Sequence, residues 1–126
     1  MTATRFESLS PILAADDLHQ ALAFYRDLLG FDLAWCWGEP PELAGICRDA
    51  IEMTLMARTD KPEGPARVYL RVTGIDALYA GLEQAGADIP VPIGDRPYGL
   101  RDFRVVDPSG NELDIGEAIA HQEAPE

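Results

Sequence analysis

Two carboxylates at matching places in strand-like segments are the first candidates for polar chemistry. Glu52 in Ile51-Glu52-Met53 and Asp114 in Leu113-Asp114-Ile115 each stand between two apolar residues. Because strand side chains alternate between two faces, each carboxylate points away from its apolar neighbours. Such carboxylates could bind a cation or a metal ion, or they could be ordinary acids on a solvent-facing surface.

Few other residues could ligate a metal. The sequence contains two histidines, His19 and His121, and two cysteines, Cys36 and Cys47, at no spacing typical of a metal site. His19 falls in the first turn of an expected helix and His121 near the end of the sequence, so we interpret both as surface residues. We interpret the cysteines as free thiols that fill apolar positions. We therefore expect no metal and no other cofactor.

Composition limits the class of protein. The 126 residues, 47% of them hydrophobic, are enough for one folded domain. No apolar stretch approaches the roughly 20 residues of a membrane helix, and the first residues lack a signal-peptide pattern, so we expect a cytoplasmic protein that does not bind membranes. The net charge of −12 argues against nucleic acid as a partner. It favours a cationic ligand, although an acidic balance also improves solubility.

Apolar periodicity and turn residues predict the elements that position these groups. We expect a helix from Leu18 to Leu29, with Asp17 as its N-cap and Gly30 as its left-handed stop. A second helix is expected over 75–85, ended by Gly86. Strands are expected at 10–15, 31–37, 44–48, 51–56, 68–72, 89–93, 100–106 and 112–115.

These elements occur twice in the order β-α-β-β-β, which indicates an internal repeat. We predict one α+β domain with module 1 at about 8–58, a linker at about 59–66, module 2 at about 67–117 and a polar tail at about 118–126. Each helix covers one face of a four-stranded sheet, so the two remaining faces can line a cup. In this arrangement Ser10 is equivalent to Arg67, and Glu52 to Asp114.

The chain resembles the vicinal oxygen chelate superfamily, which includes glyoxalase I, ring-cleaving dioxygenases, fosfomycin-resistance enzymes and the bleomycin-resistance proteins. Two motifs carry the resemblance: Asp17-Leu18 followed by 23–31 (AFYRDLLGF), and Asp107-Pro108-Ser109-Gly110-Asn111. The resemblance places Ser10, Glu52, Arg67 and Asp114 where metal-dependent members hold their metal. Because a guanidinium cannot coordinate a cation, we expect Arg67 to form an ion pair with Glu52 or Asp114 instead.

Within the superfamily the chain most resembles the bleomycin-resistance proteins, in 10–13 (SPIL), 45–49 (GICRD) and 96–103 (RPYGLRDF). This resemblance implies a homodimer that exchanges N-terminal strands at Pro11 and forms two clefts. It also implies antibiotic resistance by sequestration, in an acidic cleft lined by Trp35, Tyr69 and Tyr98. Strand alternation places Trp37 beside Trp35. Alternatively, these rings fill the core or a dimer interface.

Two functions from different classes remain open. The first is a non-catalytic protein that sequesters a cationic aromatic antibiotic of the bleomycin kind by stacking it on Trp35, Trp37, Tyr69 and Tyr98. In this hypothesis Glu52 and Asp114 supply negative charge, and Arg67 orients one of them. The alternative is a metal-dependent enzyme of the glyoxalase or dioxygenase type with an atypical site. A sensor or carrier with the same cleft would look identical in sequence.

Overall fold

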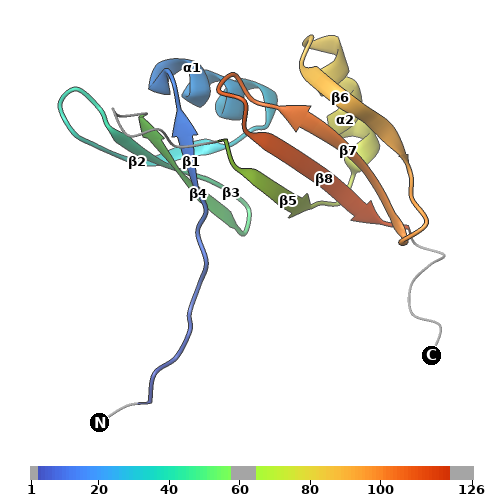
Figure 1. Cartoon of the computed structure of the whole chain (residues 1–126), viewed down its shortest axis with the longest axis horizontal. Coiled ribbons are helices and arrows are strands. Elements are labelled where there is room, and N and C mark those ends of the chain that lie inside the picture. The colour runs from blue at the N-terminus through green and yellow to red at the C-terminus, as the bar shows by residue number, and fades with distance from the viewer. Residues whose placement is uncertain (1–2, 58–64, 120–126) are drawn as a thin grey trace.

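Two βαβββ modules follow one another in the computed structural model, which describes residues 3–57 and 65–119 (Figure 1). Module 1 contains β1 (Ile12–Ala15), α1 (Leu18–Ala23), η1 (Phe24–Leu28), β2 (Asp32–Trp37), β3 (Leu43–Arg48) and β4 (Ile51–Ala57). Module 2 contains β5 (Arg67–Arg71), α2 (Ile75–Gln84), β6 (Asp88–Asp95), β7 (Leu100–Val106) and β8 (Glu112–Ala118). The predicted α+β class with tandem modules is confirmed. Most of the predicted linker and tail lies outside the described residues.

Each module forms its own four-stranded sheet with the same strand order. Sheet A runs β1-β4-β3-β2 and sheet B runs β5-β8-β7-β6. In each sheet the first strand pairs in parallel with the last, and the other neighbours are antiparallel. The identical topology of the two sheets agrees with the internal repeat that the order of elements predicted.

The first helix begins as predicted but changes its geometry half-way. The Asp17 side chain accepts a hydrogen bond of 3.1 Å from the backbone N–H of Gln20, and Gly30 ends the segment with φ of 73°. Between these ends α1 gives way to the π-helix η1. Phe24 and Tyr25, which are consecutive in sequence, are both buried there. The regular α-helical spacing of apolar residues predicted only Tyr25 on the buried face. No helix within the described residues has the length and apolar character that a membrane span requires.

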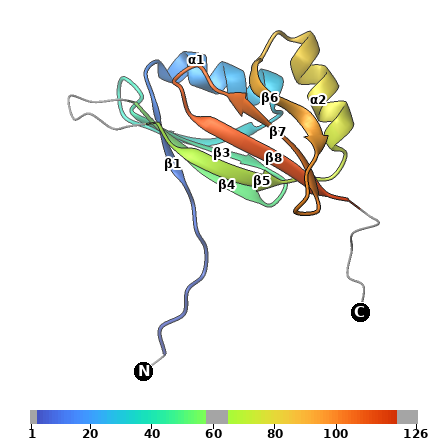
Figure 2. The same ribbon diagram turned by 45° about the vertical axis from the view of Figure 1, so that its right-hand side comes forward.

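Both modules contribute to one apolar core. Its buried residues come from the helices and from the inner faces of the two sheets, and they include Leu13, Tyr25, Ile46, Leu55, Ile75, Phe103, Leu113 and Ile115. The helices α1 and α2 lie on the same side of the sheets in both views (Figures 1 and 2). The other side of each sheet is therefore left without a covering helix.

One cysteine does not lie where the sequence predicted it. Cys36 is exposed and Cys47 is partly exposed. All six residues of β2 are exposed because β2 is the edge strand of sheet A, which the core does not cover. The expectation that both cysteines fill apolar positions is therefore wrong for Cys36.

The turn that follows β7 connects the two modules. Asp107 accepts a hydrogen bond of 2.7 Å from the Tyr25 hydroxyl through Oδ2, and Asn111 donates one of 2.8 Å to the carbonyl of Ala14. The Ser109 hydroxyl accepts a third, of 2.9 Å, from the backbone N–H of Asp16. Burial, together with the charge of Asp107, raises the pKa of Tyr25, so its hydroxyl remains a donor. The motif at 107–111 thus has a structural role.

The variant Tyr25→Phe tests this connection. It removes a buried hydrogen bond to a carboxylate, which is worth about 1.5–3 kcal/mol, and we expect the free energy of unfolding to fall by this amount. The measurement is urea denaturation followed by circular dichroism. Tyr79→Phe is the control, because no hydrogen bond from the Tyr79 hydroxyl occurs within the described residues. Equal stability of the two variants would contradict the prediction.

Candidate functional site

The candidate site lies on the faces of the two sheets that point away from the core. Buried residues such as Ile46 in sheet A and Leu113 in sheet B point toward the core, so their neighbours along each strand point outward. We call the outward surfaces open face A and open face B. Open face A carries Ile12, Trp35, Trp37, Glu52, Thr54 and Met56. Open face B carries Arg67, Tyr69, Arg71, Asp102, Arg104 and Asp114.

Two accessible tryptophans dominate open face A. Trp35 pairs with Gly45 and Trp37 with Leu43, so both indoles are on one face, as strand alternation predicted. Trp35 lies across the backbone of Gly45, where a Cβ atom would overlap the indole ring. Trp35 is 42% and Trp37 61% exposed, so neither ring belongs to the core of this chain. A ligand or a second protein surface could stack on them.

Asp102 connects the two tyrosines of open face B. Its Oδ2 accepts hydrogen bonds from the hydroxyls of Tyr69, at 2.9 Å, and Tyr98, at 2.7 Å. Its Oδ1 accepts one from Nε of Arg96, at 2.7 Å. Burial disfavours the charge of Asp102, but these three hydrogen bonds outweigh it and lower the pKa of Asp102. Burial and the hydrogen bond to Asp102 raise the pKa of Tyr69, so the phenol stays protonated.

A second carboxylate on this face lies between two guanidinium groups. Nε of Arg67 lies 2.8 Å from Oδ2 of Asp114, and Nε of Arg104 lies 2.7 Å from Oδ1. Glu112 is farther away, with Oε1 at 3.9 Å from each Nε. Of the two ion pairs that the sequence left open for Arg67, the structure contains the one with Asp114. The Asp114 side chain is 13% exposed, and the two arginines occupy both of its oxygens.

Sequence reasoning missed three residues of this face: Arg96, Asp102 and Arg104. Two of them, Arg96 and Asp102, lie within the segment 96–103 that resembled the bleomycin-resistance proteins, where only Tyr98 was considered. Arg104 could have been found from alternation, because Asp102 and Arg104 flank the buried Phe103 in β7.

The two carboxylates predicted from strand parity occupy different levels of their sheets. Ile12 pairs with Thr54 in sheet A, whereas its equivalent, Tyr69, pairs with Asp114 in sheet B. Thr54, and not Glu52, is therefore the structural equivalent of Asp114. Parity cannot detect this two-residue offset, because alternate residues of a strand share a face. Glu52 is exposed, and Ser10 reaches only its backbone carbonyl, with Oγ at 3.4 Å.

The predicted site residues thus fall into two groups on separate sheets. Trp35, Trp37 and Glu52 lie on open face A. Arg67, Tyr69 and Asp114 lie on open face B, and Tyr98 joins them through Asp102. Of the histidines, His19 is exposed on α1, as expected, and His121 lies outside the described residues.

Of the four positions that match family metal ligands, Glu52 holds an exposed carboxylate that could bind a divalent cation, and the other three hold side chains that do not fit one. Ser10 offers a neutral hydroxyl, Arg67 is itself a cation, and guanidinium groups bind both oxygens of Asp114. Across residues 3–57 and 65–119, no three His, Cys, Asp or Glu side chains form a group that could hold a metal ion. The donor set therefore gives no basis for a metal-dependent reaction step.

Comparison with known proteins identifies the family. The sequence profile of the Glyoxalase/Bleomycin resistance protein/Dioxygenase superfamily matches residues 6–115. The chain belongs to this superfamily. The match extends over both modules and includes the two motifs, at 23–31 and 107–111, on which the resemblance rested.

Solved structures of other superfamily members have the same fold. TioX from Micromonospora sp. ML1 is 22% identical, with a TM-score of 0.78, and the match covers 90% of this chain and 100% of TioX. Lactoylglutathione lyase from Agrobacterium tumefaciens is 21% identical, with a TM-score of 0.74 and coverage of 90% and 96%. The bleomycin-binding protein of Streptomyces verticillus, solved with copper(II)-bleomycin, is 26% identical, with a TM-score of 0.71 and coverage of 90% and 97%. One superfamily fold thus serves both an enzyme and a binding protein.

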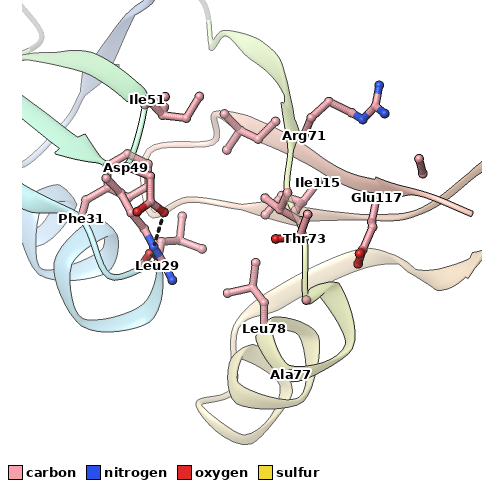
Figure 3. Close-up of a pocket in the computed structure, with 16 residues that line it drawn as sticks. Leu29, Phe31, Asp49, Ile51, Arg71, Thr73, Ala77, Leu78, Ile115 and Glu117 are labelled. Carbon is pink, nitrogen blue, oxygen red and sulfur yellow. Dashed lines mark hydrogen bonds and ion pairs between the residues drawn. The ribbon is translucent and has the colours of Figure 1, made fainter. Parts of the chain in front are cut away.

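A cavity of about 770 Å³ lies between the modules and contains none of the predicted site residues (Figure 3). Leu29 and Ile51 line it from module 1, and Leu78 and Ile115 from module 2. Glu117, at its edge, accepts a hydrogen bond of 2.9 Å from the backbone N–H of Ile75, at the start of α2. This cavity is lined mainly by apolar residues, and Arg71 at its border also belongs to open face B.

Proposed function

We propose that this protein is a non-catalytic binding protein that sequesters a flat aromatic small molecule on its open faces. The observation that carries the proposal is the exposure of aromatic rings. Among residues 3–57 and 65–119, eight large apolar side chains are exposed, and four of them are Trp35, Trp37, Tyr69 and Tyr98. Rings that a chain leaves accessible on one face of a sheet are suited to stacking with a flat ligand. The bleomycin-binding neighbour supports sequestration as the mode of action.

We further propose that two chains combine to form each cleft, with open face A of one chain opposite open face B of its partner. Residues 3–11 form no helix or strand, and residues 3–9 extend away from the rest of the chain (Figures 1 and 2). Phe6 is 98% and Leu9 94% exposed on this N-terminal arm. Apolar side chains with this exposure favour a partner surface that covers them. A homodimer that exchanges its arms would supply such a surface.

A metal-dependent lyase or dioxygenase is the less suitable function. Its chemistry needs a Lewis acid with open coordination positions, and Arg67 holds the carboxylate of Asp114 that would bind one. The proposed ligand also need not be cationic, although composition predicted a cationic one. Of the two carboxylates assigned to it, Glu52 is exposed, but Asp114 is already bound by two arginines.

The variant Trp35→Ala tests the binding function. The probe is 2-naphthamide, an uncharged double ring, and binding is followed by the NMR shift of backbone and indole N–H signals. We expect saturable binding by the wild type and about 10-fold weaker binding by Trp35→Ala, because an aromatic contact of this kind contributes about 1 kcal/mol or more.

Leu33→Ala is the matched control for this test. Leu33 is exposed on the same strand, but it pairs with the buried Ile46 and so lies on the opposite face. We expect its affinity for 2-naphthamide to equal that of the wild type. Two results would overturn the proposal: no saturable shift at millimolar 2-naphthamide, or equal affinities of Trp35→Ala and Leu33→Ala.

A further inference from the structure

The carboxylates of open face B are already neutralised within the chain. Both oxygens of Asp114 accept N–H groups of arginines. Both oxygens of Asp102 accept hydrogen bonds, from Arg96 and from the phenols of Tyr69 and Tyr98. A cationic ligand would have to displace these partners from side chains that are only 9% and 13% exposed. Neither carboxylate is therefore suited to attract a cation from solvent.

The arginines of the same face keep unused donors. A guanidinium group has five N–H donors, and the contacts of Arg67 and Arg104 with described residues engage only Nε. Arg71 makes no hydrogen bond or ion pair with any described residue. Arg71 also borders a hollow of about 450 Å³ beside Tyr98. Among the described residues that line this hollow, Arg71 is the one with a charged side chain. Arginine N–H groups that have no acceptor among the described residues suit a planar oxyanion such as a carboxylate.

The charge balance of this face differs from that of the chain. Four arginines on it, Arg67, Arg71, Arg96 and Arg104, stand against four carboxylates, Asp88, Asp102, Glu112 and Asp114, which leaves no net charge. The whole chain carries −12. Open face B is thus far less acidic than the chain as a whole, and a ligand on it interacts with the groups of this face more than with distant charges.

An aromatic ring lies between two of these arginines. Arg67, Tyr69 and Arg71 alternate along β5 and share open face B, so the Cα positions of the two arginines lie about 7 Å along the strand from that of Tyr69, on either side of it. Tyr69 is 43% exposed, and Gly116 beneath it leaves room for the ring to lie flat. A flat ring with an acidic substituent would match both parts of this surface.

We propose that open face B binds the anionic group of the ligand, so that the protein takes aromatic compounds with a carboxylate or a similar oxyanion. This inference rests on the proposed binding function and specifies its ligand class. Arg71 binds the oxyanion on one side of Tyr69, Tyr69 contacts the ring, and Arg67 and Arg104 contribute positive charge on the other side. Asp102 is a positioning residue, because it holds the hydroxyls of Tyr69 and Tyr98 on one oxygen.

Three probes with one ring and different charges test the proposal: 2-naphthoate, 2-naphthamide and 2-naphthylmethylammonium. We expect the wild type to bind the naphthoate at least 10-fold more tightly than the amide, and the ammonium more weakly than either. The preference for the naphthoate should shrink as salt is raised. Equal affinities, or tightest binding of the ammonium, would overturn the charge inference and leave the aromatic binding function standing. No binding of any of the three would overturn both.

Two variants change the charge in opposite directions. Arg71→Gln removes a cation that makes no hydrogen bond or ion pair with the described residues, so we expect the naphthoate affinity to fall 3-fold to 10-fold and the amide affinity to stay unchanged. Asp114→Asn removes a negative charge beside Arg67 and Arg104, so we expect tighter naphthoate binding. Circular dichroism checks that each variant is folded. Loss of affinity for both probes in Arg71→Gln, or unchanged naphthoate affinity in both variants, would contradict the proposal.

Discussion

Replacing Asn111 with alanine is expected to cost about 3–5 kcal/mol of stability, the largest loss from any single substitution considered for this fold. Asn111 is 1% exposed. Its amide group donates hydrogen bonds of 2.8 Å to the Ala14 carbonyl and 2.9 Å to Oδ2 of Asp107. Its Oδ1 accepts one of 2.7 Å from the backbone N–H of Ala66. One side chain therefore satisfies polar groups of both modules.

Alanine at 111 would leave these partners buried without hydrogen bonds. An unsatisfied buried polar group costs about 1–3 kcal/mol, and Asp107 would also lose one of the donors that stabilise its charge. The measurement is the urea midpoint, with the slope m checked for a change in cooperativity. Gln84→Ala is the control, because Gln84 is exposed at the end of α2, and it should stay within about 0.5 kcal/mol of the wild type. A loss below about 1 kcal/mol for Asn111→Ala would contradict this account.

Local patterns were sufficient to predict the elements and their repetition. The strand expected at 100–106 has these bounds in the structure, and both helices begin and end within two residues of their expected limits when α1 and η1 are taken together. Such elements depend on short-range periodicity and on caps such as Asp17 and Gly30, which the sequence displays directly. The π-helix could not be predicted in this way. It depends on the burial of both Phe24 and Tyr25, which is a property of tertiary packing.

Pairing between strands is what sequence reasoning could not supply. Residue types were enough to predict an ion pair for Arg67, but the choice of Asp114 over Glu52 follows from the register of β5 and β8. The offset between Glu52 and Asp114 has the same origin. One sequence signal was available and unused, because glycine inside a strand often marks a close approach. Gly45 and Gly116 lie beneath Trp35 and Tyr69.

Net charge alone does not show which carboxylates of a sheet face are free to bind a ligand. A charge of −12 describes the long-range field of the whole chain, whereas a ligand on a sheet face meets the few groups within contact distance. A count of charged residues treats Asp102 and Asp114 as free negative charges. In the structure, arginine side chains bind both carboxylates through hydrogen bonds and ion pairs. The pattern of pairing, more than the sum of charges, therefore decides which ligand the face can hold.

The N-terminal arm carries the prediction with the largest effect on assembly. If the arms are exchanged in a homodimer, Phe6 and Leu9 become buried against the partner chain. Each side chain would then contribute about 1.5–3 kcal/mol of apolar burial. The double variant Phe6→Asp, Leu9→Asp places two charges at these positions. We expect it to weaken the dimer at least about 100-fold, which light scattering would detect as a change from dimer to monomer mass at micromolar concentration.

A charge-matched variant separates the loss of burial from simple repulsion. Thr4→Asp with Ser8→Asp adds the same two charges to polar positions of the same arm, and this variant should remain dimeric. If each cleft needs both chains, the monomeric variant should also bind 2-naphthamide more weakly, although Trp35 and Tyr69 are intact in it. A wild-type protein that is monomeric, or a double variant that stays dimeric, would show that the arm has another role. Each chain would then have to bind its ligand on one open face alone.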